Sequence, residues 1–104
     1  AATTSDCTLE TEVSRQYRAY AFGADDPVVR LAEEGLRRAG VEPTRAFSGG
    51  AADANVFNER GLACVNLANG MVDIHTPDER IAVADLERMV DVTLALVDAA
   101  CEAP

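Results

Sequence analysis

The spacing of apolar and polar residues predicts three strands along the chain. Residues 7–17 alternate between apolar and polar side chains, which is typical of a strand with one wet face. Arg15 falls on the drier face, either as a rim residue whose charge reaches water or as a functional cation. Two shorter segments, 45–47 and 62–67, are also predicted as strands, and the nearly continuous apolar run of the second indicates a buried one.

Three other segments carry apolar side chains at helical spacing. Residues 27–39 follow a candidate N-cap, Asp26, and stop before Gly40. A short helix is predicted over 53–59, and the helical period returns in a long segment that begins at Ala84. The resulting order of strand, helix, strand, helix, strand, helix predicts an α/β layered fold. The first strand differs in character from the apolar later ones, which suggests that it belongs to another sheet.

Composition and charge limit the partners of such a domain. The 104 residues suffice for one small domain, and a formal charge of −9 argues against nucleic acid or an anionic membrane as the main partner. No apolar run reaches the ~20 residues that a membrane-spanning helix needs. The cysteines are odd in number, lie far apart and form no C-x-x-C pair, so reduced thiols in a cytoplasmic protein are the simplest interpretation: Cys7, Cys64 and Cys101.

Two loops that follow predicted strands are the candidate sites of chemistry. In open α/β sheets, ligands gather outside the carboxyl ends of the strands. The loop over 48–58 contains Gly49 and Gly50, which either form an ordinary tight turn or let backbone N–H groups approach a ligand. The loop over 69–79 holds the single histidine, His75, among several acidic residues. A lone histidine is more often structural than a ligand, and one imidazole does not make a closed zinc site.

At these loops the sequence resembles a known family. Residues 48–79 read SGGAADANVFNERGLACVNLANGMVDIHTPDE. This stretch is similar, without gaps, to the C-terminal motif of the co-catalytic zinc exopeptidases, which include peptidase T, tripeptidase-like aminopeptidases, carboxypeptidase G and acetylornithine deacetylase. The peptidase T-like branch resembles it most, and the similarity extends over most of the chain. The sequence is therefore identified as the C-terminal part of such an enzyme.

The resemblance implies a domain division and a fold. Residues 1–22 are expected to end the α+β lid or dimerisation domain, with 7–17 as its last strand. Residues 23–104 are expected to form the C-terminal segment of a three-layer αβα catalytic domain. Residues 1–22 should then not pack in the core of the rest, and the unpaired strand could join two copies into a homodimer.

The resemblance also implies roles for individual residues. His75 matches a zinc ligand, and Glu79 matches a residue that supports the metal site or fixes its loop without being a ligand. Four residues match the lining of the substrate site: Gly49, Gly50, Asp53 and Asn55. Asn55 or nearby N–H groups are expected to hold the polar backbone of the substrate, and Asp53 either does the same or caps the short helix. His75 is expected to lie on an exposed loop.

The implied reaction belongs to the full-length enzyme. Two zinc ions would activate a water that cleaves short peptides, and the remaining ligands and the general base lie upstream in the family. This chain alone is therefore expected to bind no zinc and to be inactive. Alternatives are an N-acyl amino acid deacylase of the same family, a non-catalytic α/β binding module, or an unrelated α/β domain. Specificity is left open by departures from the family pattern at Ala51, Ala52, Ala63, Cys64, Ala68 and Asn69.

Overall fold

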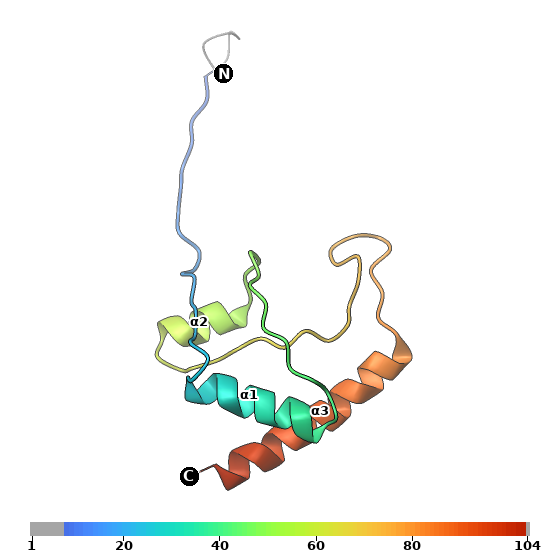
Figure 1. Ribbon diagram of the computed structural model, residues 1–104. Coiled ribbons are helices and arrows are strands. Elements are labelled where there is room, and N and C mark those ends of the chain that lie inside the picture. Colours follow the sequence, from blue (N-terminus) through green and yellow to red (C-terminus); the bar gives the residue numbers. More distant parts are fainter. Residues whose placement is uncertain (1–7, 104) are drawn as a thin grey trace.

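The computed structural model describes residues 8–103, and three helices supply its regular structure (Figure 1). Helix α1 spans Pro27–Arg38, α2 spans Asp53–Glu59 and α3 spans Val83–Glu102. Each helix matches a segment predicted as helical, and the ends that were predicted differ from the observed ends by at most one residue. The three helix predictions are therefore confirmed. The long helix begins one residue before Ala84.

Helix α1 begins and ends where its sequence predicts. Asp26 is the N-cap residue, and its Oδ2 accepts a hydrogen bond from the backbone N–H of Gly23 at 2.6 Å, so the carboxylate ties the preceding turn to the helix start. Pro27 occupies the first turn, where its missing N–H is not needed. At the other end Gly40 adopts a φ of 72°, and the N–H of Val41 donates to the carbonyl of Leu36 at 2.8 Å.

Helices α1 and α3 pack against each other, and they are the only pair of described helices in contact. Gly35 is buried at their crossing, where a Cβ atom on it would lie 2.7 Å from Leu96 Cγ and 3.1 Å from Leu96 Cα. The absent side chain therefore permits the close approach. Arg38 adds polar links, because it pairs with Glu34 on its own helix at 2.8 Å and with Glu102 at the end of α3 at 2.9 Å.

The strand predictions over 7–17, 45–47 and 62–67 are wrong for this structure. Within residues 8–103 these segments run extended but belong to no strand, and the single β-type pairing there is the isolated bridge between Val72 and Arg80. Cys7 lies outside the described residues. A strand exists through its hydrogen-bonded neighbour, and none of these segments has one in the described part of the chain. The sheet layer of the expected αβα architecture is therefore not assembled here.

The molecule consequently has an open shape and a small core. Its radius of gyration is 19.0 Å, whereas a compact chain of about 100 residues has about 13 Å. The buried hydrophobic residues are Ala32, Ala54, Val92 and Ala99. Residues 8–17 are exposed and run away from the helices (Figure 1). Among the described helices, none has the length and apolar character to cross a membrane.

Candidate functional site

The glycine loop leads directly into α2. Gly49 and Gly50 form an exposed bend after the extended segment over 41–48, and the N–H of Gly50 donates to Ser48 Oγ at 3.2 Å. Asp53 is the first residue of α2 and is exposed; the N-cap position belongs to Ala52. The alternative role of Asp53 as the helix cap is therefore not realised, whereas its place on the lining of a substrate site stays a prediction.

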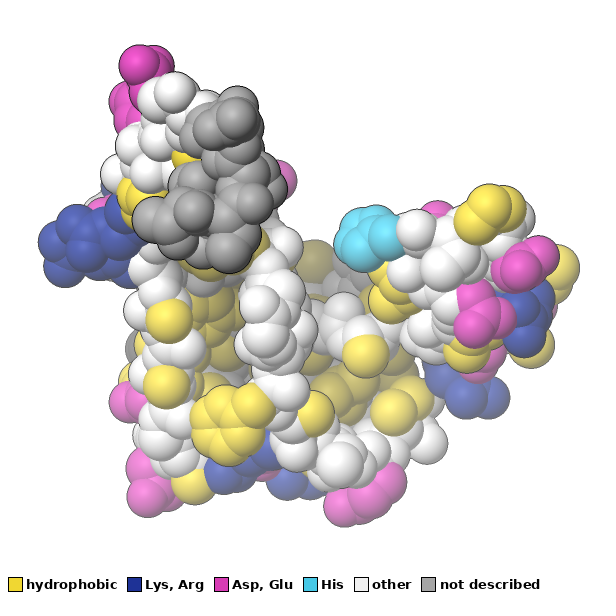
Figure 2. Space-filling view, turned by 90° about the horizontal axis from the view of Figure 1, so that it is seen from above, with side chains coloured by type: hydrophobic (Ala, Val, Ile, Leu, Met, Phe, Trp, Pro, Cys, Tyr) yellow, Lys and Arg dark blue, Asp and Glu magenta, His cyan; other side chains and the backbone are white. Residues whose placement is uncertain are grey.

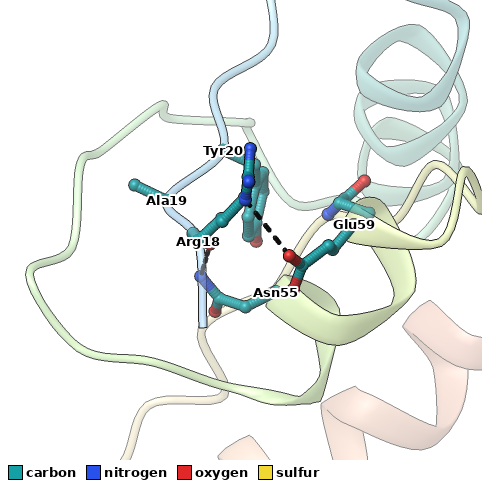
Figure 3. A pocket seen from close by; sticks show the side chains of 6 residues that line it. Arg18, Ala19, Tyr20, Asn55 and Glu59 are labelled. Atoms are coloured by element: carbon teal, nitrogen blue, oxygen red, sulfur yellow. Dashed lines mark hydrogen bonds and ion pairs between the residues drawn. The ribbon is translucent and has the colours of Figure 1, made fainter. Parts of the chain in front are cut away.

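Asn55 is turned into the chain. It is 6% exposed, its Oδ1 accepts from the N–H of Ala52 at 2.9 Å, and its Nδ2 donates to the carbonyl of Arg18 at 2.8 Å. The first bond satisfies a backbone donor at the helix start, and the second ties the extended N-terminal segment to α2 (Figure 3). A substrate contact by Asn55 stays a prediction, and in this conformation the amide serves the backbone of its own chain.

Asn58 is a residue that the sequence analysis did not single out. Its Nδ2 donates to the carbonyls of Ala54 and Cys64, both at 2.7 Å, and its Oδ1 accepts from the N–H of Cys64 at 3.0 Å. A signal for it was present, because asparagine is a poor residue for a helix interior and favours side-chain bonds to backbone. Two asparagines on one face of a seven-residue helix therefore indicate a role in fixing the neighbouring chain.

A cleft of about 490 Å³ lies between α2 and the extended N-terminal segment (Figure 3). An ion pair crosses it, with Arg18 Nε 3.2 Å from Glu59 Oε1, and both side chains are largely exposed. Of the residues that line the cleft, Asn55 is also a site residue predicted from the sequence; the full set is Arg18, Ala19, Tyr20, Asn55, Asn58 and Glu59. The missed residues lie in segments that become neighbours through the asparagine contacts, which a linear pattern does not reveal.

The histidine lies on a short loop that is closed on itself. Val72 and Arg80 face each other across the loop base, and each donates its N–H to the carbonyl of the other, at 3.0 and 3.2 Å. Within the loop, Asp73 and His75 adopt positive φ angles of 54° and 67°. Such angles are uncommon in residues with a side chain, so the surrounding contacts must hold them. His75 is exposed, as expected (Figure 2).

Three side chains supply those contacts. Glu79 Oε2 accepts from the backbone N–H of His75 at 2.9 Å, so this carboxylate holds the loop backbone at the histidine itself. Thr76 Oγ1 donates to the carbonyl of Asp73 at 2.7 Å, and Arg80 forms an ion pair with the Asp73 carboxylate. Together they close a turn that projects the imidazole outward.

The stem of this loop rests on the start of α3. Gly70 has a φ of 86°, and a Cβ atom there would lie 3.0 Å from the carboxylate carbon of Asp85. Glycine therefore meets both a backbone and a space requirement at this position.

The described residues do not form a metal centre by themselves. No group of three His, Cys, Asp or Glu side chains among residues 8–103 is placed to hold a metal ion. A protein zinc site takes three or four ligands, and His75 offers one exposed imidazole. The structure is thus compatible with His75 as one ligand of a site completed by other residues, and incompatible with a complete site in this chain segment.

Comparison with known proteins places the chain. Residues 5–99 match the family described as Peptidase family M20/M25/M40. The uncharacterized protein YqjE of Bacillus subtilis is 30% identical over 93 residues, which cover 89% of this chain and 25% of that protein. A succinyl-diaminopimelate desuccinylase of Xylella fastidiosa is 33% identical over 70 residues, covering 66% of this chain and 19% of the enzyme.

The structure itself resembles part of a solved enzyme. It superposes on the crystal structure of aminopeptidase PepT from Bacillus cereus with a TM-score of 0.82 and 34% sequence identity, over 88% of this chain and 24% of the aminopeptidase. The chain thus spans about a quarter or less of these relatives. The superposition supports a zinc-exopeptidase-like fold of which this chain is one portion, and the family match over residues 5–99 shows that the chain belongs to Peptidase family M20/M25/M40.

Proposed function

We propose that this chain is the C-terminal part of a metallopeptidase that hydrolyses short peptides. The observation that carries the proposal is the superposition on aminopeptidase PepT, which covers 88% of the chain with a TM-score of 0.82 and 34% sequence identity. The relatives are about four times as long as the matched segment, so most of the catalytic machinery is expected in the remainder of a longer polypeptide.

Within this proposal His75 supplies one imidazole to a two-zinc centre. The bound zinc ions would supply an activated water and polarise the scissile carbonyl. The contribution of the chain is to hold the imidazole at the tip of the closed loop over 72–80, with Glu79 fixing the backbone beneath it. The imidazole must be neutral to bind metal.

The glycine loop is the proposed contact for the substrate. Gly49 and Gly50 leave the backbone of this exposed loop open to close approach by a peptide. Asp53 begins α2 just beyond the loop, and Asn55 is the third residue of this helix. We assign these four residues to the side of the site that holds the polar backbone of the substrate.

The test uses the full-length enzyme with two substrate sets, tripeptides with a free N-terminus and N-acyl amino acids. Release of the N-terminal amino acid from tripeptides, dependent on added zinc and abolished by a chelator, is the expected result. Preference for the N-acyl amino acids would replace the peptidase proposal by a deacylase, which similarity to a succinyl-diaminopimelate desuccinylase favours as the second candidate. Inactivity on both sets would favour a non-catalytic binding module.

The Asn55→Ala variant tests the substrate side. If Asn55 contacts substrate, kcat/KM falls while zinc stays bound, because the imidazole is untouched. The substitution also removes two backbone contacts, so thermal unfolding must be measured in parallel. Unchanged kcat/KM in folded protein would remove Asn55 from the substrate site.

A further inference from the structure

Polar side chains connect helix α2 to the neighbouring backbone. Helix-to-helix packing among residues 8–103 occurs between α1 and α3, and α2 takes no part in it. A seven-residue helix has little stability of its own, so its position must come from other contacts. Two side-chain amides of α2 reach backbone beyond its caps: Asn55 donates to the carbonyl of Arg18, 37 residues away, and Asn58 donates to the carbonyl of Cys64, 6 residues away.

The side chain of Asn58 bonds to both backbone groups of Cys64, as the backbone of a residue on a neighbouring strand would. It donates to the carbonyl of Cys64 at 2.7 Å and accepts from the N–H of Cys64 at 3.0 Å, so both backbone groups of that residue are satisfied by one side chain. Its second amide hydrogen goes to the carbonyl of Ala54 at 2.7 Å. An asparagine side chain provides two donors and an acceptor on a short stem, which matches these three backbone groups.

These bonds connect α2, which follows the glycine loop, to the segment that precedes the histidine loop. The glycine loop at 49–50 runs directly into α2, and Cys64 lies in the extended segment that leads to the histidine loop over 72–80. We propose that Asn58 is a positioning residue, which fixes the substrate loop relative to the segment carrying His75; this inference rests on the proposed function. Asn58 itself touches neither metal nor substrate in this role.

The first experiment compares Asn58→Ala with the unchanged full-length enzyme on a tripeptide. Loss of the amide lets α2 shift against the 62–68 segment. A misplacement of about 1 Å can lower a rate by about 100-fold, so kcat is expected to fall by about 10- to 100-fold with a smaller change in KM. Zinc content should stay unchanged, because the closed histidine loop is intact. Asp91→Ala, an exposed change on α3 away from α2, is the control and should leave both constants unchanged.

The Asn58→Asp variant supplies a readout that a merely structural role would not move. Its ionised carboxyl has the shape of the amide but faces the carbonyls of Ala54 and Cys64 without a proton to donate. When protonated, the carboxyl can again donate to the carbonyl of Cys64 and accept from the N–H of Cys64. The activity of this variant relative to the unchanged enzyme at the same pH should therefore rise as the pH falls toward the pKa of the introduced carboxyl, which the two facing carbonyls and partial burial raise above the ordinary aspartate value of about 3.9, and Asn58→Ala should show no such rise.

A second measurement keeps the inference testable without any known substrate. Amide hydrogen exchange of the segment over 62–68 should be faster in Asn58→Ala, because the N–H of Cys64 loses its acceptor. If exchange is faster in Asn58→Ala but the unchanged enzyme cleaves no peptide, the Asn58–Cys64 contact is supported and the proposed function is contradicted. Unchanged exchange, or an unchanged kcat in an active enzyme, would overturn the positioning role, as would loss of zinc in parallel with kcat.

Discussion

His75 and Asn55 are constrained by their surroundings in opposite ways. His75 adopts a φ of 67° on an exposed loop, and the hydrogen bond from its N–H to Glu79 helps to hold that angle. Asn55, by contrast, is buried and bound to backbone on both sides. The histidine is therefore presented outward at some conformational cost, whereas the asparagine stabilises its surroundings.

Substitution of His75 and of Glu79 should separate metal binding from loop geometry. In the full-length enzyme, His75→Ala is expected to lower zinc content and remove most activity with a nearly normal fold. Glu79→Ala removes the acceptor for the His75 N–H and should cost less, about 10- to 100-fold in activity. Glu79→Gln keeps an oxygen acceptor and is the matched control, which should lie between Glu79→Ala and the unchanged enzyme. Metal analysis and kcat/KM measure both effects. Full zinc occupancy in His75→Ala would contradict the ligand assignment.

At the scale of elements, the α1–α3 pair is the firmest part of the chain. The helical spacing predicted all three helices because side-chain periodicity and capping residues act locally. The strand predictions were wrong for the described residues, because a strand depends on pairing partners that are distant in sequence. In the candidate site, too, local features were predictable from the sequence and long-range contacts were not. The glycine bend and the histidine loop were visible as motifs, whereas the cleft beside Arg18 depends on contacts that span 37 residues.

The crossing of α1 and α3 should be sensitive to one methyl group at Gly35. A Cβ atom there would meet the backbone and side chain of Leu96, so the helices must separate or Leu96 must move. Gly35→Ala in the full-length protein is expected to destabilise it by about 1–3 kcal/mol despite the better helix propensity of alanine. Urea unfolding measures the change. Gly23→Ala is the control: its Cβ would lie at an ordinary 3.6 Å from Asp26, so its stability should change by less than about 0.5 kcal/mol.

Glu33 should make the contact between α1 and the segment around Arg45 depend on pH. The hydrogen bond from Arg45, opposed by partial burial and helped by a hydrogen bond from Arg37, lowers the pKa of Glu33 below its ordinary value. A carboxyl with a lowered folded-state pKa contributes stability that is present above the unfolded pKa and is lost as the pH falls through the folded pKa. Glu33→Gln should therefore reduce the melting temperature at neutral pH and have less effect in acid. Equal reductions at every pH would contradict this account.

At the scale of the whole molecule, the chain leaves much apolar surface uncovered. A stripe along α3 is exposed and consists of Val83, Leu86, Val90, Leu94 and Val97. Hydrophobic side chains also gather on the face between the extended N-terminal segment and the histidine loop (Figure 2). Surfaces of this kind are unusual in self-sufficient domains and mark contact with further protein. They agree with a chain that matches about a quarter of its relatives.

The isolated 104-residue chain is expected to have no peptidase activity, since the described residues place no three metal ligands together. Incubation with tripeptides and added zinc should release no amino acid above a mock preparation. Turnover that copurifies with the chain and disappears with a chelator would refute this expectation. The predicted homodimer through residues 7–17 can be checked on the same sample by sedimentation. The comparison is a variant that lacks residues 1–16, which should sediment as a monomer if the segment joins two copies.

The open shape exposes the segment around Phe47 to proteases. Its side chain is 99% exposed, and it lies in an extended segment without a paired neighbour. Extended backbone of this kind fits the active sites of endoproteases, which cut accessible segments first. Chymotrypsin should therefore cut the isolated chain early after Phe47, whereas a partner strand beside the segment would shield it. In a cell, exposure of this segment would make the unpaired chain a substrate for proteases. A chain whose segment is covered by further protein would be protected.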